Sequence, residues 1–126
     1  MPIVTDSLEH RVQIGVWEGI VTREDIIEGK GELRALADEY GYATYVQIID
    51  TKQLDLLQPR SPMLKQLMND CERTIAYLVI DGPYFSQVAT RLLRRITNCP
   101  IENFSTLPEA LNRAREIVAA SEPASV

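Results

Sequence analysis

Three times along the chain, an apolar run typical of a β-strand ends in a polar residue that is followed by the start of a helix. These junctions lie at residues 45–51, 75–83 and 101–106. Strands that feed helices in this way build βαβ units, in which parallel strands are joined by right-handed crossovers. We therefore predict one α/β domain of order βαβαβαβα, with helices packed on a mostly parallel sheet of four to five strands.

Four segments carry strand patterns. Residues 11–21 alternate apolar and polar side chains, which predicts a half-buried strand, and Gly19 within them indicates a bulge or a close backbone approach. The other strands are predicted at residues 43–49, 74–80 and 101–104. The most apolar of them, residues 74–80, is expected to be central, and the residues before the first strand carry no clear pattern.

The sequence of the first predicted helix begins with a capping pattern but contains two glycines that destabilise a helix. Thr22 is followed three positions later by an acidic residue, the pattern of a capping box. Gly29 and Gly31 each weaken a helix by roughly 1 kcal/mol relative to alanine. We predict an irregular segment at residues 24–30 and then a firmer helix that ends at Gly41.

Cap residues also mark the later helices. Residues 51–60 are predicted to form a loop, after which Ser61 caps the second helix with Pro62 at its first helical position. Apolar spacing over residues 85–96 predicts the third helix. Thr106 begins a second capping-box pattern and precedes the last helix.

The acidic balance of the chain argues against nucleic acid as a partner. The net charge is −5 and the isoelectric point is near 4.9, whereas nucleic-acid binding needs a basic face that neutralises phosphates. The one basic cluster, Arg91, Arg94 and Arg95, is interpreted as the solvated face of a helix.

The cysteines and the histidine do not form a metal-site pattern. A structural zinc site normally uses four Cys or His ligands at short spacings, and the chain holds only Cys71, Cys99 and His10. We predict no metal and no cofactor. Cys71 is interpreted as a buried thiol and Cys99 as an exposed loop residue. A disulfide bond between them stays open, although a cytosolic chain would not normally keep one.

Neither a membrane span nor a signal peptide is predicted. No run of 18 apolar residues occurs, and the amino terminus lacks a basic start and an apolar middle. We expect a cytoplasmic protein in which residues 1–120 form the domain and residues 121–126 form a disordered C-terminal tail.

Parallel strands bring the residues at their carboxyl ends to one edge of the sheet, where open α/β sheets bind ligands or partners. The candidate binding residues at this edge are Asp50, Thr51, Ser61, Asp81, Tyr84 and Ser105. Asp50 and Asp81 have the chemistry of an acid–base pair, but aspartates that end strands also commonly accept backbone N–H groups in turns. No nucleophile, base and orienting group can be assembled, so we assign no catalytic residue and expect no enzyme.

The order of elements and three local patterns resemble the STAS-like domains related to anti-sigma-factor antagonists, in the stage II sporulation protein AA-like branch. The patterns are an early strand that ends at residues 18–22, an apolar strand that ends at Asp50, and a closing segment at residues 104–111. The resemblance covers roughly residues 10–120. It implies a small regulatory or binding module without catalytic chemistry, acting through a protein partner or a homodimer.

The resemblance also singles out Ser61. In the antagonist proteins, a partner kinase phosphorylates a serine at the start of the second helix, and this switches partner binding. Ser61 occupies the corresponding helix start, which implies a phospho-acceptor. The aspartate before and the glycine after the family's serine are missing here, where residues 58–63 read Gln-Pro-Arg-Ser-Pro-Met. Helix capping alone also explains a serine at this position.

The alternative function is a carrier of a small apolar, lipid-like ligand, because related-looking folds use a groove between sheet and helices for such molecules. Trp17 and five tyrosines are candidates to line this groove. Core packing is the other interpretation for Tyr45 and Tyr77, which lie inside predicted strands. Trp17 is expected to face outward, where it would suit a protein interface.

Overall fold

The computed structural model describes residues 2–68, 73–83 and 99–122. In this part of the chain, five strands form one sheet of order β1-β2-β3-β4-β5, in which β1 is antiparallel to β2 and the other neighbours are parallel. The mostly parallel α/β architecture confirms the prediction. The elements are β1 (Ile3–Glu9), β2 (Val12–Val21), α1 (Arg23–Tyr40), β3 (Tyr45–Leu57), α2 (Ser61–Leu67), β4 (Thr74–Ile80), β5 (Ile101–Phe104) and α4 (Leu107–Ser121).

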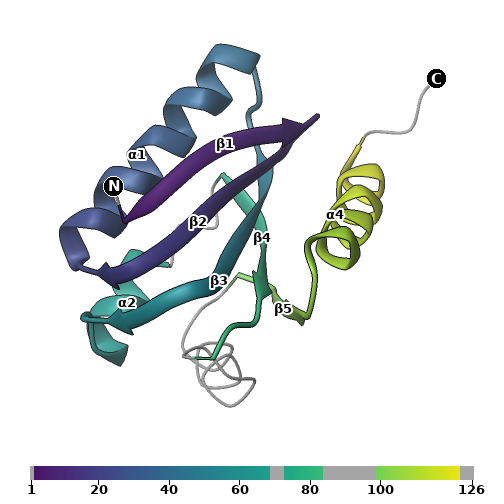
Figure 1. Ribbon diagram of the computed structural model, residues 1–126. Helices are drawn as coiled ribbons and strands as arrows, with labels where there is room; N and C mark the ends of the chain where they lie inside the picture. The colour runs from purple at the N-terminus through teal and green to yellow at the C-terminus, as the bar shows by residue number, and fades with distance from the viewer. Residues whose placement is uncertain (1, 69–72, 84–98, 123–126) are drawn as a thin grey trace.

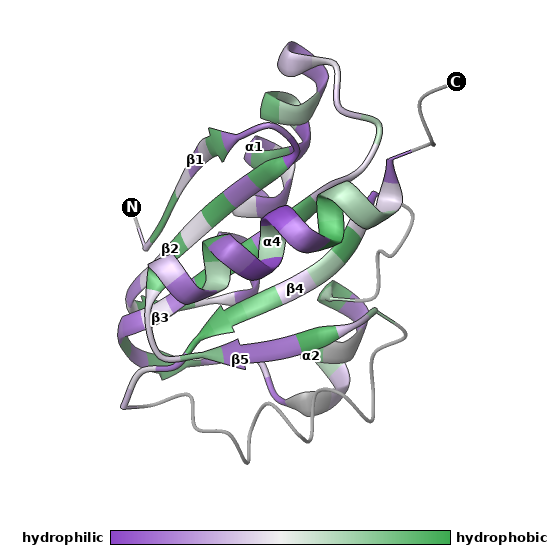
Figure 2. Ribbon diagram, turned by 90° about the vertical axis from the view of Figure 1, so that its right-hand side faces the viewer, coloured by the Kyte–Doolittle hydropathy of each residue, from purple (hydrophilic) through white to green (hydrophobic). Residues whose placement is uncertain are grey.

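The sheet lies between two helical layers, with α1 and α2 on one side and α4 on the other (Figure 1). Successive strand residues point to opposite faces, so each layer has its own apolar core. On one face, strand side chains pack against Ile26 of α1 and Leu64 of α2. On the other, they pack against Ala110, Ala114 and Val118 of α4, which crosses the sheet in Figure 2. We call these the α1–α2 face and the α4 face.

β1 is a strand that the sequence analysis does not predict. It lies at the edge of the sheet and alternates buried Ile3 with exposed Val4. Asp6 and Leu8 are exposed as well. The strand is therefore covered on one face only, and no run of buried apolar residues marks it in the sequence.

The predicted loop at residues 51–60 is wrong as far as Leu57, because β3 continues to that residue. Its buried residues recur at every third position, at Thr51, Leu54 and half-buried Leu57, where a regular strand repeats every second one. The register with β2 shifts twice along this stretch. Gly19, predicted to mark a bulge or a close backbone approach, adjoins the second shift with a φ of +62°. The extra residue of this shift, Asp55, lies on β3.

α1 is one continuous helix, so the predicted irregular segment at residues 24–30 is wrong. The capping box at Thr22 is confirmed, and Gly41 ends the helix as predicted in a left-handed conformation with a φ of +78°. Gly29 is buried against β1, where a Cβ atom would lie 3.1 Å from Cγ2 of Ile3. This close packing leaves little room for a side chain and explains the glycine at this position, despite its helix propensity cost of roughly 1 kcal/mol.

Three single-residue predictions are also corrected. Arg60, not Ser61, is the N-cap of α2, so Ser61 is the first helical residue and Pro62 the second. Trp17 is only 4% exposed and packs in the core of the α1–α2 face, because α1 and α2 cover this face of β2. Cys99 is buried and disulfide-bonded, and not an exposed thiol.

Several predictions fall on residues outside the described part of the chain. These are the helix at residues 85–96 with its arginine cluster, the candidate Tyr84 and the environment of Cys71. The last helix is as predicted, and the side chain of its N-cap, Thr106, accepts the backbone N–H of Glu109. The helix continues through Ser121, one residue beyond the predicted end of the domain.

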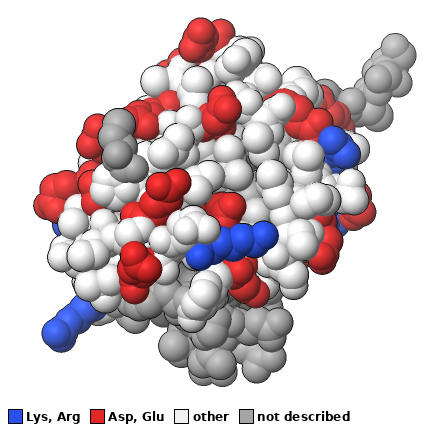
Figure 3. Space-filling view, viewed as in Figure 1, with Lys and Arg blue, Asp and Glu red and all other residues white. Residues whose placement is uncertain are grey.

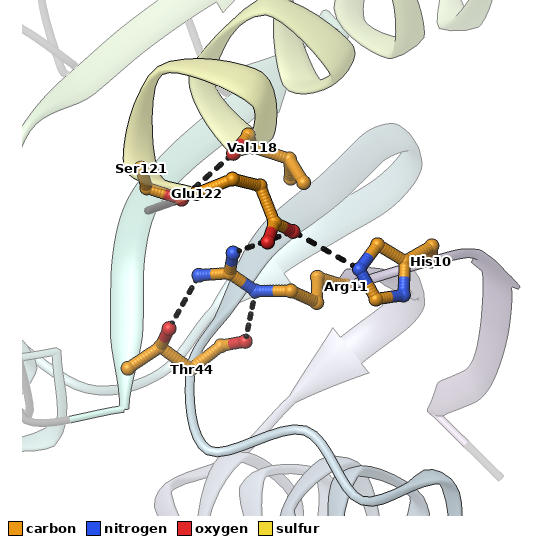
Figure 4. Close-up of polar contacts among 6 residues, drawn as sticks. All are labelled: His10, Arg11, Thr44, Val118, Ser121 and Glu122. Atoms are coloured by element: carbon orange, nitrogen blue, oxygen red, sulfur yellow. Dashed lines mark hydrogen bonds and ion pairs between the residues drawn. The ribbon is translucent and has the colours of Figure 1, made fainter. Parts of the chain in front are cut away.

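The end of α4 is tied to the turn between β1 and β2 (Figure 4). Oε1 of Glu122 lies 3.0 Å from Nη1 of Arg11 and 3.0 Å from Nε2 of His10. Nε of Arg11 also donates to the carbonyl oxygen of Thr44 at 3.0 Å, so one guanidinium links the turn, α4 and the start of β3. These bonds, first that from Arg11, hold the pKa of Glu122 below its ordinary value.

Candidate functional site

The sheet separates the two aspartates that the sequence analysis places at one edge. Asp50 is aligned with Ile80, which packs against α4. Asp81 accepts a hydrogen bond at 2.6 Å from Asn103, which is aligned with Val79 of the α1–α2 core. Aligned residues of parallel strands point to the same face. Asp50 and Asp81 therefore lie on opposite faces, and this arrangement does not form an acid–base pair.

Each aspartate is also held by its surroundings. Oδ1 of Asp50 accepts the backbone N–H of Lys52 at 3.0 Å, which is the local turn bond that aspartate commonly makes. Oδ1 of Asp81 accepts the amide of Asn103. Both bonds fit the structural interpretation of these carboxylates.

Thr51 is part of the core and is not open to a ligand. It is 1% exposed, and its hydroxyl donates to the carbonyl oxygen of Ile80 at 2.7 Å. Next to this bond, Gly82 packs directly on the backbone of Thr51 and Lys52. The end of β4 and the middle of β3 are thus locked together at the predicted edge.

The remaining edge residues lie on separate loops and helix starts. Ser61 begins α2, and Pro62 and Met63 after it are exposed. Ser105 is exposed between β5 and α4, directly before the helix cap Thr106. Whether Ser61 and Ser105 contact a partner stays a prediction.

The space between the sheet and the α1–α2 layer is largely filled. Two cavities there each have a volume of about 10 Å³, and Trp17 and Met68 line both. A volume of this size holds about one water molecule. In the first cavity, Nζ of Lys30 donates to the hydroxyl of Tyr77 at 2.8 Å. Tyr45 and Tyr77 are fully buried, which agrees with core packing.

A larger hollow of about 150 Å³ lies at the surface beside the amino-terminal end of β1. Asp25, Glu28 and Glu32 of α1 line it together with Ile3 and Pro2. Its acidic lining differs from the apolar groove that a lipid-like ligand would need.

Exposed apolar side chains gather elsewhere, on the α4 face of β2 and β3. Ile20 and Leu56 are aligned neighbours, and they are 53% and 42% exposed. The residues that follow them, Val21 and Leu57, pack on the α1–α2 face. Because strand side chains alternate, Ile20 and Leu56 point to the α4 face, where α4 leaves them uncovered.

The same face of the sheet carries exposed apolar surface on β1, on the other side of Glu18. Val4 is 50% exposed and is aligned with half-buried Val16, which packs at the margin of the α4 core. We call Val4, Val16, Ile20 and Leu56 the β2–β3 patch. The sequence analysis misses it because Leu56 falls in a predicted loop and Val4 precedes the first predicted strand. The alternation along β2 is the one signal that could have pointed to Ile20.

Two further findings concern residues 2–68, 73–83 and 99–122. No group of three or more His, Cys, Asp or Glu side chains among them is placed to hold a metal ion. No helix in the same part of the chain has both the length and the apolar character to cross a membrane.

No protein-family model and no curated protein sequence matches the chain significantly. Two solved structures are similar to it. One is an uncharacterised DUF3478-family protein with a SpoIIAA-like fold from Shewanella loihica PV-4, with a TM-score of 0.65, 20% identity, and coverage of 89% of this chain and 91% of that chain. The other is the anti-sigma factor antagonist SpoIIAA in its unphosphorylated form, with a TM-score of 0.56, 10% identity, and coverage of 90% and 97%. The resemblance seen in the sequence is confirmed at the level of the fold: the chain has a STAS-like, SpoIIAA-like fold.

Proposed function

We propose that the chain is a non-enzymatic regulatory module that acts by binding a protein partner. The observation that carries the proposal is the β2–β3 patch, in which Ile20 and Leu56 expose large apolar side chains side by side. Contiguous exposed apolar surface is a feature of interaction sites. The separation of Asp50 from Asp81 by the sheet agrees with a role other than catalysis.

The fold supports a regulatory role of this kind. One of the similar structures is an anti-sigma factor antagonist in its unphosphorylated form, and Ser61 begins the helix at which the resemblance implies phosphorylation. A phosphate adds a charge of roughly −1.5 to −2. On a chain of net charge −5, this addition next to exposed Pro62 and Met63 would repel an acidic partner and attract a basic one.

Cross-linked affinity capture from the source cells tests the proposal, with wild type, Ser61→Ala and Ser61→Glu as baits. We expect wild type and Ser61→Ala to capture the same partner and Ser61→Glu to capture it to a different extent. Ala119→Glu is the matched control, because it adds the same charge at an exposed position of α4 outside the candidate binding residues. Equal capture by all four baits would remove Ser61 from the proposal. A wild-type bait that captures no protein and remains monomeric would contradict the interaction role itself.

We also propose a cytoplasmic location, and the disulfide bond at Cys99 provides its test. Cytosolic thiols are normally kept reduced, so the cysteines of a cytoplasmic pool should be alkylated when cells are quenched with acid and the protein is then denatured and treated with a thiol reagent at neutral pH. Full protection of the cysteines in cells would contradict this location.

A further inference from the structure

Carboxylates border the β2–β3 patch on the same face of the sheet. Asp6 and Asp50 are aligned with residues of β2 and β4 that pack against α4, so both point to the α4 face. Glu18 precedes Ile20 by two residues and shares its face. Asp6 and Glu18 are exposed, Asp50 is half-buried, and Lys52 is an exposed cation at this border.

Apolar and acidic side chains therefore share this face of the three strands. Along β2, Val16, Glu18 and Ile20 follow one another on the α4 face. Acidic side chains are also more prominent than basic ones in the view of the molecule from the β1 side (Figure 3). A surface of this kind offers burial to apolar groups and ion pairs to cations placed between them.

We propose that the β2–β3 patch is the docking surface for a basic amphipathic segment of the protein partner. Apolar side chains of the segment pack on Ile20, Leu56 and Val4, and its lysines or arginines pair with Glu18 and the neighbouring carboxylates. This assignment rests on the proposed function, since it names the surface and the chemistry of the partner.

The charges favour such a segment over a second copy of the chain. In a two-fold symmetric dimer, the same patch faces itself on both subunits. The surface that carries Asp6, Glu18 and Asp50 would then face the same acidic surface of the second copy, and like charges brought together in this way oppose binding. A basic segment places opposite charges at the same positions.

A synthetic peptide provides a direct probe. An 18-residue helical peptide with leucines on one side and lysines on the other is titrated into the full chain by calorimetry, at low and high salt. A second peptide carries glutamate at every lysine position. We expect the lysine peptide to bind wild type, to bind less tightly at high salt, and the glutamate peptide not to bind.

The Ile20→Ser/Leu56→Ser double variant should weaken binding of the lysine peptide by about tenfold or more, because both central apolar contacts are lost. The matched control is Ile27→Ser, which removes a 45% exposed isoleucine from α1, in the other helical layer. Both variants change exposed positions, so each should keep the circular dichroism spectrum of wild type. Glu18→Gln removes the negative charge next to Ile20 and leaves the apolar side chains in place, so it tests the ion pairs with the peptide separately.

Failure of the lysine peptide to bind, equal affinity of the double variant, or equal binding of the glutamate peptide would overturn the docking surface. Self-association that the double variant abolishes, measured by sedimentation, would assign the patch to a second copy and also overturn it. If the cellular partner captured by wild type is retained by the double variant, the surface is wrong and the proposed function stands. If wild type has no partner, the proposed function fails instead.

Discussion

Gly82 has no space for a side chain, which makes Gly82→Ala a sharp test of how the edge of the sheet is built. A Cβ atom at this position would overlap the carbonyl oxygen of Thr51 and lie 2.7 Å from Cα of Lys52. Carbon atoms normally approach to about 3.5–4.0 Å, so the chain must move by roughly 1 Å. The obstructing atoms belong to the backbone of β3, which is paired with β2 on its other side, and they cannot swing away as a side chain would.

Overpacking of this kind costs about 1–3 kcal/mol, and the rigid backbone contact places Gly82→Ala near the upper end. Alanine also restricts the unfolded chain, which offsets about 0.4–1 kcal/mol. We expect a net loss of about 2 kcal/mol in the free energy of unfolding. For a domain of this size, the loss corresponds to a fall in Tm of about 8 °C.

Urea unfolding followed by circular dichroism measures this loss. Gly31→Ala is the control, because Gly31 lies in α1 and a Cβ atom there meets no other atom within 4 Å. Removal of a helical glycine should raise the free energy of unfolding by about 0.5–1 kcal/mol. The reasoning is refuted if Gly82→Ala lies within about 0.5 kcal/mol of wild type, the range typical of surface substitutions.

Three further outcomes follow from the core, the helix cap and the ion pairs. Trp17→Ala should lower the free energy of unfolding by about 3–5 kcal/mol, and a loss under about 1 kcal/mol in the urea assay would contradict the buried position of Trp17. Thr22→Ala should cost about 1 kcal/mol by the same assay, whereas Thr22→Ser keeps the capping hydroxyl and should match wild type. An NMR titration should place the pKa of Glu122 below 4.5, the ordinary value, and Arg11→Gln should raise it. Because the pKa of Glu122 is lowered in the folded state, its bonds to Arg11 and His10 stabilise the fold above the ordinary pKa, and this stabilisation is lost as the pH falls through the folded pKa. A titration midpoint of Glu122 at 4.5 in both wild type and Arg11→Gln would exclude these bonds in solution.

Local patterns predict the well-covered parts of the fold. The strands at Thr74–Ile80 and Ile101–Phe104 have the predicted bounds, and the helix caps at Thr22 and Thr106 are in place. In β4 a buried apolar run, and at the two helix starts a capping side chain, is both the cause of the element and the signal in the sequence. At these positions, interactions between residues close together in the sequence are enough to determine the element. β5 is a short edge strand in which only Ile101 is fully buried.

The predictions are wrong where contacts between segments distant in the sequence determine the structure. The burial of Trp17 depends on α1 and α2 covering β2, which the alternation in β2 alone does not reveal. The second half of β3 is a strand because β2 pairs with it through two register shifts. Its buried residues recur at every third position, which is not the period of a strand, so the sequence pattern favours a loop there. The edge position of β1 and exposed Val4 depend equally on the arrangement of the sheet.

The candidate site shows the same limit. The sequence predicts correctly that Asp81 follows a strand parallel to that of Asp50. The prediction that Asp50 ends its strand is wrong, because Asp50 lies within β3. The face on which each side chain lies depends on the position of the residue along its strand. The two carboxylates point to opposite faces of the sheet. The β2–β3 patch forms only when β1, β2 and the extension of β3 are aligned, so no single segment of the sequence contains it.

The most direct test of the account is an amide NMR spectrum of the isotope-labelled chain, with and without the partner captured from cells. The account predicts that the largest changes occur at residues 16–21 and 53–57, which carry most of the β2–β3 patch, while Ile27 and its neighbours on the outer side of α1 stay unchanged. Changes confined to α1 and α2, with residues 16–21 and 53–57 unaffected, would contradict it.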